Sequence, residues 1–420
     1  MVGRRFGLRL GAACIGAMLA LAACGGSDGS EGNGGGSTDG AGSGDPVKLM
    51  IIAPVGDTGL NHPEMVAAVK AAVRGVNERG GIKGRPVEVI HCNEKNDPAV
   101  AKECAQQAVD EGVLAVVAEI SGSGGIMPIL AEAGIPSVGS AGISADGSEL
   151  SSEISFMISP LTYYPAVCPA ILQKAGATKI GLVGYDLSAS DRLITMAQAG
   201  GRAVGLPIDP ELRIPITTSD FTPTVTRLNR SGADGAVLVV FDQAAYAVIK
   251  DGGPQLRTCH AAGTLSEDFL ATLGPAADNL VVATAFPEFS QADEFPELAR
   301  MIRELDAEHA AGNPDAAPEL RNSTSTTGAW LSVQIVEKVG NAVPGELTSK
   351  ALLEQLNATS DLDLGLVPPI DFTTPSPIPG ATRIFNSTLR AARWDSTAGT
   401  FVPLGSETYD ALELLRQGAN

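Results

Sequence analysis

The sequence predicts an α/β protein made of two Rossmann-like, doubly wound lobes joined by a three-segment hinge. Length is the first observation: roughly 375 residues follow a leader and a Gly-rich segment, which is more than one hydrophobic core usually serves. The second is that short β-branched runs alternate with longer amphipathic segments from Val47 onward. The third is that this alternation comes in two series, which implies right-handed crossovers and two parallel sheets.

The first series begins with a nearly continuous apolar run at residues 47–53, typical of a parallel strand buried on both faces. A helix is expected over 63–79, because Pro63 occupies its first turn and apolar residues recur on one side. Gly80 and Gly81 end it. The series continues with strand 86–90, helix 99–111, strand 113–119, loop 121–125, helix 126–133 and strand 135–139.

The second series follows the same pattern. It comprises strand 180–184, helix 191–199, strand 236–241, helix 243–250 and strand 280–285. The C-terminal third is less regular: residues 295–309 and 328–339 are predicted to be helices, and 366–379 is rich in Pro and irregular. Short strands are expected at 383–385, 389–394 and 400–403.

The N-terminus indicates export. Arg4, Arg5 and Arg9 precede an apolar stretch over 10–20 that is too short to span a bilayer. Leu21-Ala22-Ala23-Cys24 resembles a bacterial lipobox, in which the Cys receives lipid. We therefore expect residues 1–23 to be a lipoprotein signal peptide and Cys24 to be the lipid anchor. The alternative is an ordinary secretory signal with an incidental Cys. Residues 24–46 are expected to form a flexible linker, because ten of residues 25–45 are Gly.

Charge and cysteine content narrow the function. Loss of residues 1–23, with three Arg and no acidic residue, changes the net charge from −19 to −22, which argues against a nucleic-acid partner. Four Cys remain in an oxidising compartment, so two disulfides are expected. Proximity in sequence favours Cys92–Cys104 with Cys168–Cys259 among three connectivities. No metal site is expected, because none of the four His has ligand spacing, and we expect no cofactor.

Three sequence blocks resemble the type I periplasmic solute-binding proteins, in the branched-chain amino acid (Leu/Ile/Val) binding family of ABC transporters. The first is VNERGGIKGRP at 76–86. The second is NDP at 96–98 with the following helix and GVLAVV at 112–117. The third is AGIPSV at 133–138, followed by a Ser/Gly loop. Their order and spacing match that family over residues 47–290.

This resemblance implies an extracytoplasmic, lipid-anchored solute-binding protein of an ABC importer. Such a protein captures a small polar solute, an amino acid or a related carboxylate, between its lobes and delivers it to a membrane permease. It implies residues 47–160 plus 284–385 as lobe 1 and 161–283 plus 386–420 as lobe 2. The chain is expected to be a monomer, with no enzymatic activity.

The predicted site lies where strands of a doubly wound sheet end, at the switch point of strand order. Two loops of lobe 1 follow such strands, and in the family these loops hold the solute's carboxylate and ammonium. The residues expected there are Ser121, Ser123, Gly124, Ser140, Ala141, Gly142 and Ser144. The alternative is that both loops are ordinary tight turns between strand and helix.

Lobe 2 contributes Phe241, Asp242, Ser266 and Glu267, with the two acidic residues as candidates for a solute ammonium. Tyr163 lies at the first hinge crossing, where it either stacks on a solute or packs beneath the hinge. Asp242 has an alternative role as a solvated helix N-cap. Ile143 in lobe 1 and the segment 186–190 in lobe 2 depart from the family pattern, so a branched-chain amino acid is not assured as the solute.

Two other classes of function compete with solute binding. A hydrolase is disfavoured, because no nucleophile–base pair and no G-x-S-x-G or H-E-x-x-H sequence is present. A structural or regulatory envelope lipoprotein that keeps this fold without a ligand is the main alternative to a solute-binding protein.

Overall fold

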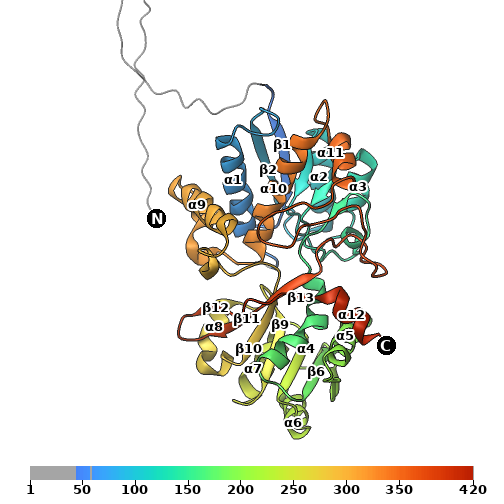
Figure 1. Cartoon of the computed structure of the whole chain (residues 1–420), viewed down its shortest axis with the longest axis vertical. Helices are drawn as coiled ribbons and strands as arrows, with labels where there is room; N and C mark the ends of the chain where they lie inside the picture. The colour runs from blue at the N-terminus through green and yellow to red at the C-terminus, as the bar shows by residue number, and fades with distance from the viewer. Residues whose placement is uncertain (1–43, 57–58, 420) are drawn as a thin grey trace, which may run out of the picture. The chain divides into compact units, whose positions relative to one another are not determined.

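The computed structural model describes residues 44–56 and 59–419, apart from the side chains of Ala189 and Asp242, and contains two sheets flanked by helices (Figure 1). The first sheet has five strands in the order β2-β1-β3-β4-β5, and the second has eight, with β12-β11-β10-β9-β8-β6-β7 as its main path. We call the first sheet with its helices lobe 1 and the second lobe 2. The predicted fold class, two doubly wound α/β lobes, is confirmed.

Lobe 1 is built on strands that are all parallel. They are β1 (Val47–Ile52), β2 (Val87–Cys92), β3 (Ala115–Val117), β4 (Ser137–Val138) and β5 (Ser155–Phe156). Strand β1 is buried on both faces, as its apolar run predicts. Leu49 and Ile51 belong to the core beneath α1 (Pro63–Glu78) and α10 (Ser325–Ala342). Met50 and Ile52 belong to the core beneath α2 (Pro98–Asp110) and α3 (Ile126–Ala133).

Lobe 2 repeats this plan with an antiparallel extension. Strands β6 (Ile180–Tyr185), β7 (Glu211–Ile214), β8 (Gly235–Val239), β9 (Arg257–Ala261) and β10 (Leu280–Thr284) are parallel, and β11 (Thr388–Asp395) and β12 (Thr400–Pro403) are antiparallel. One face packs on α4 (Tyr164–Lys174), α5 (Ser188–Ala203) and α12 (Ala411–Gly418). The other packs on α6 (Thr222–Arg230), α7 (Asp242–Asp251) and α8 (Glu267–Leu273).

The chain passes between the lobes three times. It leaves lobe 1 after β5, returns after β10 to form α9 (Pro296–Ala310), α10 and α11 (Ser349–Asn357), and enters lobe 2 again at β11. Strand β13 (Tyr409–Asp410) then pairs with the start of β11. Three passages are what the predicted three-segment hinge requires.

One predicted strand is wrong. Residues 383–385 form no strand, and only a single bridge joins Ile384 to Met157. The reason lies in Arg383, whose guanidinium lies 4.7 Å from the ring centroids of Phe156 and Phe385 and donates to the Ser155 carbonyl at 2.7 Å. These side-chain contacts add to the backbone hydrogen bonds with Met157, which extend no further than the single bridge.

Both lobes contain a disulfide. Cys92, at the end of β2, is bonded to Cys104 of α2. Cys168 of α4 is bonded to Cys259 of β9. Each bond therefore joins a helix to the sheet on which it packs.

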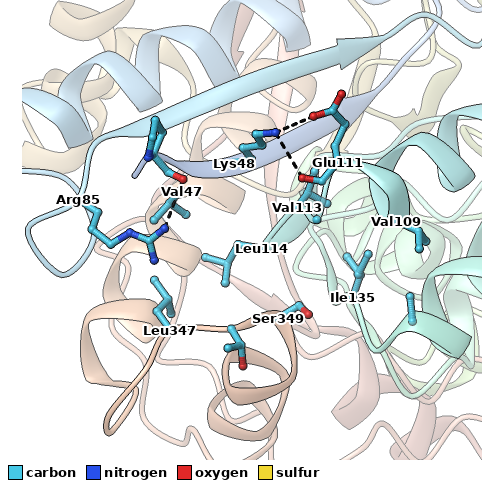
Figure 2. Close-up of a pocket in the computed structure, with 14 residues that line it drawn as sticks. Val47, Lys48, Arg85, Val109, Glu111, Val113, Leu114, Ile135, Leu347 and Ser349 are labelled. Carbon is cyan, nitrogen blue, oxygen red and sulfur yellow. Dashed lines mark hydrogen bonds and ion pairs between the residues drawn. The ribbon is translucent and has the colours of Figure 1, made fainter. Parts of the chain in front are cut away.

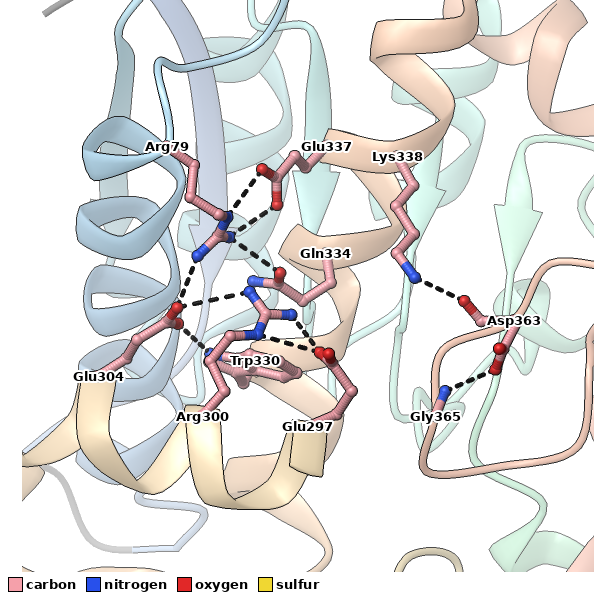
Figure 3. A network of polar contacts seen from close by, with 10 residues as sticks. All are labelled: Arg79, Glu297, Arg300, Glu304, Trp330, Gln334, Glu337, Lys338, Asp363 and Gly365. Atoms are coloured by element: carbon pink, nitrogen blue, oxygen red, sulfur yellow. Dashed lines mark hydrogen bonds and ion pairs between the residues drawn. The ribbon is translucent and has the colours of Figure 1, made fainter. Parts of the chain in front are cut away.

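A polar network joins α1, α9 and α10 on one side of lobe 1 (Figure 3). Glu304 of α9 accepts from Arg79 Nη1 at 2.7 Å and from Trp330 Nε1 at 2.6 Å. Arg79 also pairs with Glu337 of α10 at 2.7 Å. Gly75 of α1 permits this approach, because a Cβ at that position would collide with the Glu304 carboxylate.

Candidate functional site

The candidate site lies at the carboxyl ends of the parallel strands, where strand order reverses in each sheet. In lobe 1 the reversal falls between β1 and β3, and in lobe 2 between β6 and β8. Ligands of doubly wound sheets bind outside these points. The loops that follow the strands therefore supply the site, and most of the predicted residues are on them.

In lobe 1, several polar groups of the predicted loops already have hydrogen-bond partners within the protein. Ser121 Oγ accepts from the Ser123 amide at 3.0 Å, and Ser140 Oγ lies 3.4 Å from Ser155 Oγ. The Ala141 amide donates to the Glu119 carbonyl at 2.9 Å. Ser121, Ser123 and Ser140 are all buried. The loops therefore form hydrogen bonds within the protein. These bonds leave fewer donors available to a solute carboxylate.

Asp146 occupies the amino end of α3, where the helix dipole favours a negative group. One of its carboxylate oxygens accepts from the Gly125 amide at 2.8 Å, and the other from Ser144 Oγ at 3.0 Å and Ser148 Oγ at 2.7 Å. Burial alone would raise its pKa, but these hydrogen bonds lower it, so Asp146 is ionised. The protein's own carboxylate therefore fills a position suited to an anion.

Behind these loops lie three buried acidic side chains, Glu94, Glu119 and Glu149. Glu119 follows β3 and is 1% exposed, and neither of its carboxyl oxygens has a hydrogen-bond partner. Burial, together with the charges of Glu149, Glu94 and Asp146, raises the pKa of Glu119 well above its ordinary value. This carboxyl therefore keeps its proton at pH values that ionise an exposed glutamate.

Lobe 2 presents aromatic rings at the equivalent edge. Phe241, directly before α7, is 66% exposed, and its ring centroid lies 5.3 Å from that of Tyr185 at the end of β6. Tyr246 and Phe269, on α7 and α8, form a second pair with centroids 4.1 Å apart. The Tyr185–Phe241 pair spans the reversal of strand order, because β6 and β8 are neighbours.

The acidic candidate of lobe 2, Glu267, is the first residue of α8. Burial and the nearby Asp268 raise its pKa. Ser266 caps the same helix through its Oγ, which accepts from the Phe269 amide at 3.3 Å. Glu288, at the second passage between lobes, was not predicted; burial and the charge of Glu267 raise its pKa to about 7 despite a hydrogen bond from Ser323.

Tyr163 is completely buried and its hydroxyl lies 2.9 Å from Ser376 Oγ, so the structure shows the packing role and no surface for stacking on a solute. The side chain of Asp242 lies outside the described residues. Tyr185 and Glu119 were missed; a signal existed, since each directly follows or ends a predicted strand.

A separate pocket of about 470 Å³ lies at the opposite, amino-terminal edge of the lobe 1 sheet (Figure 2). Its charged side chains are engaged with neighbours: Lys48 pairs with Glu111 at 2.6 Å, and Arg85 Nε donates to the Asp45 carbonyl at 2.8 Å. Leu114 and Leu347 form apolar walls. The pocket is therefore distinct from the candidate site.

Two features are absent from the described part of the chain. No helix there is long and apolar enough to cross a membrane. Among residues 44–56 and 59–419, no group of His, Cys, Asp and Glu side chains could hold a metal ion.

The two lobes, three passages and strand-end loops define a solute-binding protein of the periplasmic type. The family model described as "Periplasmic binding protein" matches residues 49–399, and the chain belongs to this family. That assignment confirms the predicted resemblance and the prediction of a binding protein that is not an enzyme.

Individual relatives are more distant. The "Leu/Ile/Val-binding protein homolog 6" of Brucella abortus is 26% identical over 329 residues, covering 74% of this chain and 80% of the relative. A branched-chain amino acid ABC transporter protein from Thermus thermophilus, solved with bound valine, has a TM-score of 0.64 at 18% identity and covers 89% and 98% of the two chains. A fatty acid ABC transporter substrate-binding protein from Thermomonospora curvata has a TM-score of 0.65 at 18% identity, covering 90% and 95%.

Proposed function

We propose that this protein is the lipid-anchored, extracytoplasmic solute-binding component of an ABC importer. It captures a small, amino acid-like solute between its lobes and presents it to a membrane permease. Lobe 1 comprises residues 47–160 and 284–385, and lobe 2 comprises 161–283 and 386–420. The observation that carries the proposal is the repeated reversal of strand order, with polar loops in lobe 1 and exposed rings in lobe 2 at the corresponding edges.

The relatives support this proposal. Their names connect this fold with Leu/Ile/Val binding, with bound valine and with fatty acids. The fold therefore serves solutes of different polarity, and the side chains at the strand ends of this chain must select its own solute.

A thermal-shift screen of the exported protein tests the proposal. At a concentration about 100 times the dissociation constant, a bound solute adds roughly 2.7 kcal/mol to the free energy of unfolding. Amino acids, amines, small carboxylic acids and polyols form the panel. A shift by one class supports solute capture, whereas no shift by any member contradicts it.

The internal hydrogen bonds of Ser121, Gly125 and Ala141 favour one competing function, a structural envelope lipoprotein without a ligand. The same screen separates the two, because that protein would ignore the whole panel. Anchoring is tested independently with Cys24→Ser. The variant should leave the detergent phase or remain unprocessed, and unchanged partitioning would contradict the anchor.

A further inference from the structure

The two edges of the parallel sheets differ in charge. The carboxyl edge comprises the loops after β1–β4 and β6–β9, each taken together with the first residue of the helix that follows it. Among the described residues, these segments hold eight acidic residues and one Lys or Arg, Lys95; the acidic residues are Glu94, Asp97, Glu119, Asp146, Asp186, Asp220, Asp242 and Glu267. The imbalance far exceeds that of the chain, which has 48 acidic and 29 basic residues.

The opposite edge serves as an internal comparison. The loops that lead into β2, β3, β4, β6, β7, β8, β9 and β10 hold four acidic and four basic residues. These are Glu111, Asp209, Asp234 and Asp278 with Arg79, Lys83, Arg85 and Lys179. The surplus of acidic residues is therefore specific to the edge at which doubly wound sheets bind ligands. A general need for solubility would not favour one edge.

The position best suited to an anion in lobe 1 is already occupied. Asp146 accepts from the Gly125 amide at the start of α3, and a Cβ on Gly124 would collide with the same carboxylate. The Ala141 amide is committed to the Glu119 carbonyl. A solute carboxylate would thus have to displace Asp146 or bind beside it, and both arrangements are electrostatically unfavourable.

Apolar groups gather at this same edge. Of the five large hydrophobic side chains that are exposed in the described part of the chain, three lie in these strand-end segments, Ile143, Ile216 and Phe241, and a fourth, Phe269, lies in the first turn of α8. Phe241 packs against the buried ring of Tyr185 where strand order reverses in lobe 2. The face of an aromatic ring attracts an ammonium group, and it also packs against apolar groups.

We infer that the solute is recognised as an organic cation: an ammonium group with an apolar body, bound without a subsite for a carboxylate. This inference rests on the proposed function and names the solute class for the same site. Asp146 and Glu267 supply negative charge to the ammonium, and the exposed ring of Phe241, which packs against the buried ring of Tyr185, receives the apolar body. The solute's own positive charge offsets the repulsion among the acidic residues of this edge.

Calorimetric titration with two matched series tests the inference. One series is phenylalanine, 2-phenylethylamine and 3-phenylpropionate; the other is leucine, 3-methylbutylamine and 4-methylpentanoate. Within each series the amine should bind at least as tightly as the amino acid, and at least about tenfold more tightly than the acid. Affinity for the amine should fall when NaCl is raised to about 0.5 M, because salt screens the attraction.

Substitutions at Phe241 separate ring from apolar area. Phe241→Trp should preserve amine binding, Phe241→Leu should weaken it, and Phe241→Ala should weaken it by about tenfold. Leu320→Ala is the matched control, because Leu320 is 45% exposed but lies outside the strand-end loops. It should leave the affinity unchanged.

The outcomes distinguish this inference from the proposed function. Tighter binding of the acids than of the amines would overturn the cation class while leaving solute capture intact. Amino acids that bind tightly while both amines fail would show a carboxylate subsite and overturn the inference as well. If all six compounds fail, including phenylalanine and leucine, the proposed function is contradicted and the inference falls with it.

Discussion

Glu288, at the second passage between the lobes, makes the stability of the protein depend on pH. Its pKa in the folded protein is about 7, raised chiefly by burial, against an ordinary value of 4.5. The folded state therefore holds a proton that the unfolded state releases. The resulting stability is complete below pH 4.5 and is lost as the pH rises through about 7.

We expect Glu288→Gln to remove this pH dependence, because glutamine resembles the protonated carboxyl in shape and can still accept a hydrogen bond from the Gln291 amide. Urea denaturation at pH 4.5 and pH 8.5 measures the effect. The wild-type protein should lose on the order of 3 kcal/mol more than the variant between these values. Glu88→Gln on the exposed side of β2 serves as the control. An equal loss in wild type and Glu288→Gln would contradict the assignment.

Single residues of the site were only partly predictable from the sequence. The loops of Ser121 and Ser140 were located correctly, because a parallel strand followed by Gly and Ser is visible in the chain. Their internal hydrogen bonds were not, since the partners Glu119, Asp146 and Ser155 come from separate strands and loops. The hydroxyl partner of Tyr163 is likewise distant in sequence, because Ser376 lies 213 residues away.

At the scale of elements, the Glu304 network holds α9 against α1 and α10. Glu304→Ala would leave Trp330 Nε1 and the Arg79 guanidinium without this acceptor, and the Trp330 ring is fully buried. We expect a loss of about 2–4 kcal/mol in the free energy of unfolding, with a smaller loss for Glu304→Gln. Chemical denaturation measures both variants. Arg303→Ala, exposed on the same helix, should change stability by less than about 0.5 kcal/mol. A neutral Glu304→Ala would show that the network does not stabilise the fold.

The two disulfides should differ in their contribution. Cys92–Cys104 spans 12 residues and Cys168–Cys259 spans 91. In the chain-entropy model these loops correspond to about 3 and about 4.5 kcal/mol. The double variant Cys168→Ser/Cys259→Ser should therefore unfold at a lower urea concentration than Cys92→Ser/Cys104→Ser. The reverse order would mean that native-state packing outweighs loop closure.

Elements with a strong pattern were predicted from the sequence, and elements defined by long-range contacts were not. The apolar run of β1 and the Pro-initiated α1 need no distant partner to be recognised. By contrast, β5 has two residues and α11 has nine, and each is stabilised by elements remote in sequence. The wrong strand at 383–385 shows the same limit, because the contacts of Arg383 with Phe156 and Ser155 cannot be read from the local pattern.

At the scale of the whole molecule, capture of a solute by two lobes predicts a hinge motion at the three passages of the chain. Solution X-ray scattering of the protein with saturating solute should give a smaller radius of gyration than without solute. Addition of a non-binding compound of similar size is the control. Identical profiles at saturation would contradict closure and indicate a rigid protein.

The central claim is that the carboxyl edge of the lobe 1 sheet and that of the lobe 2 sheet bind one solute jointly. Calorimetric titration of the wild-type protein, Ile143→Ala and Phe241→Ala tests it directly, because Ile143 (46% exposed) belongs to lobe 1 and Phe241 to lobe 2. The account predicts one solute per chain and weaker binding in both variants, by roughly threefold or more, with Leu320→Ala unchanged. A stoichiometry of two, or an affinity that ignores the variant of either lobe, would contradict a shared site.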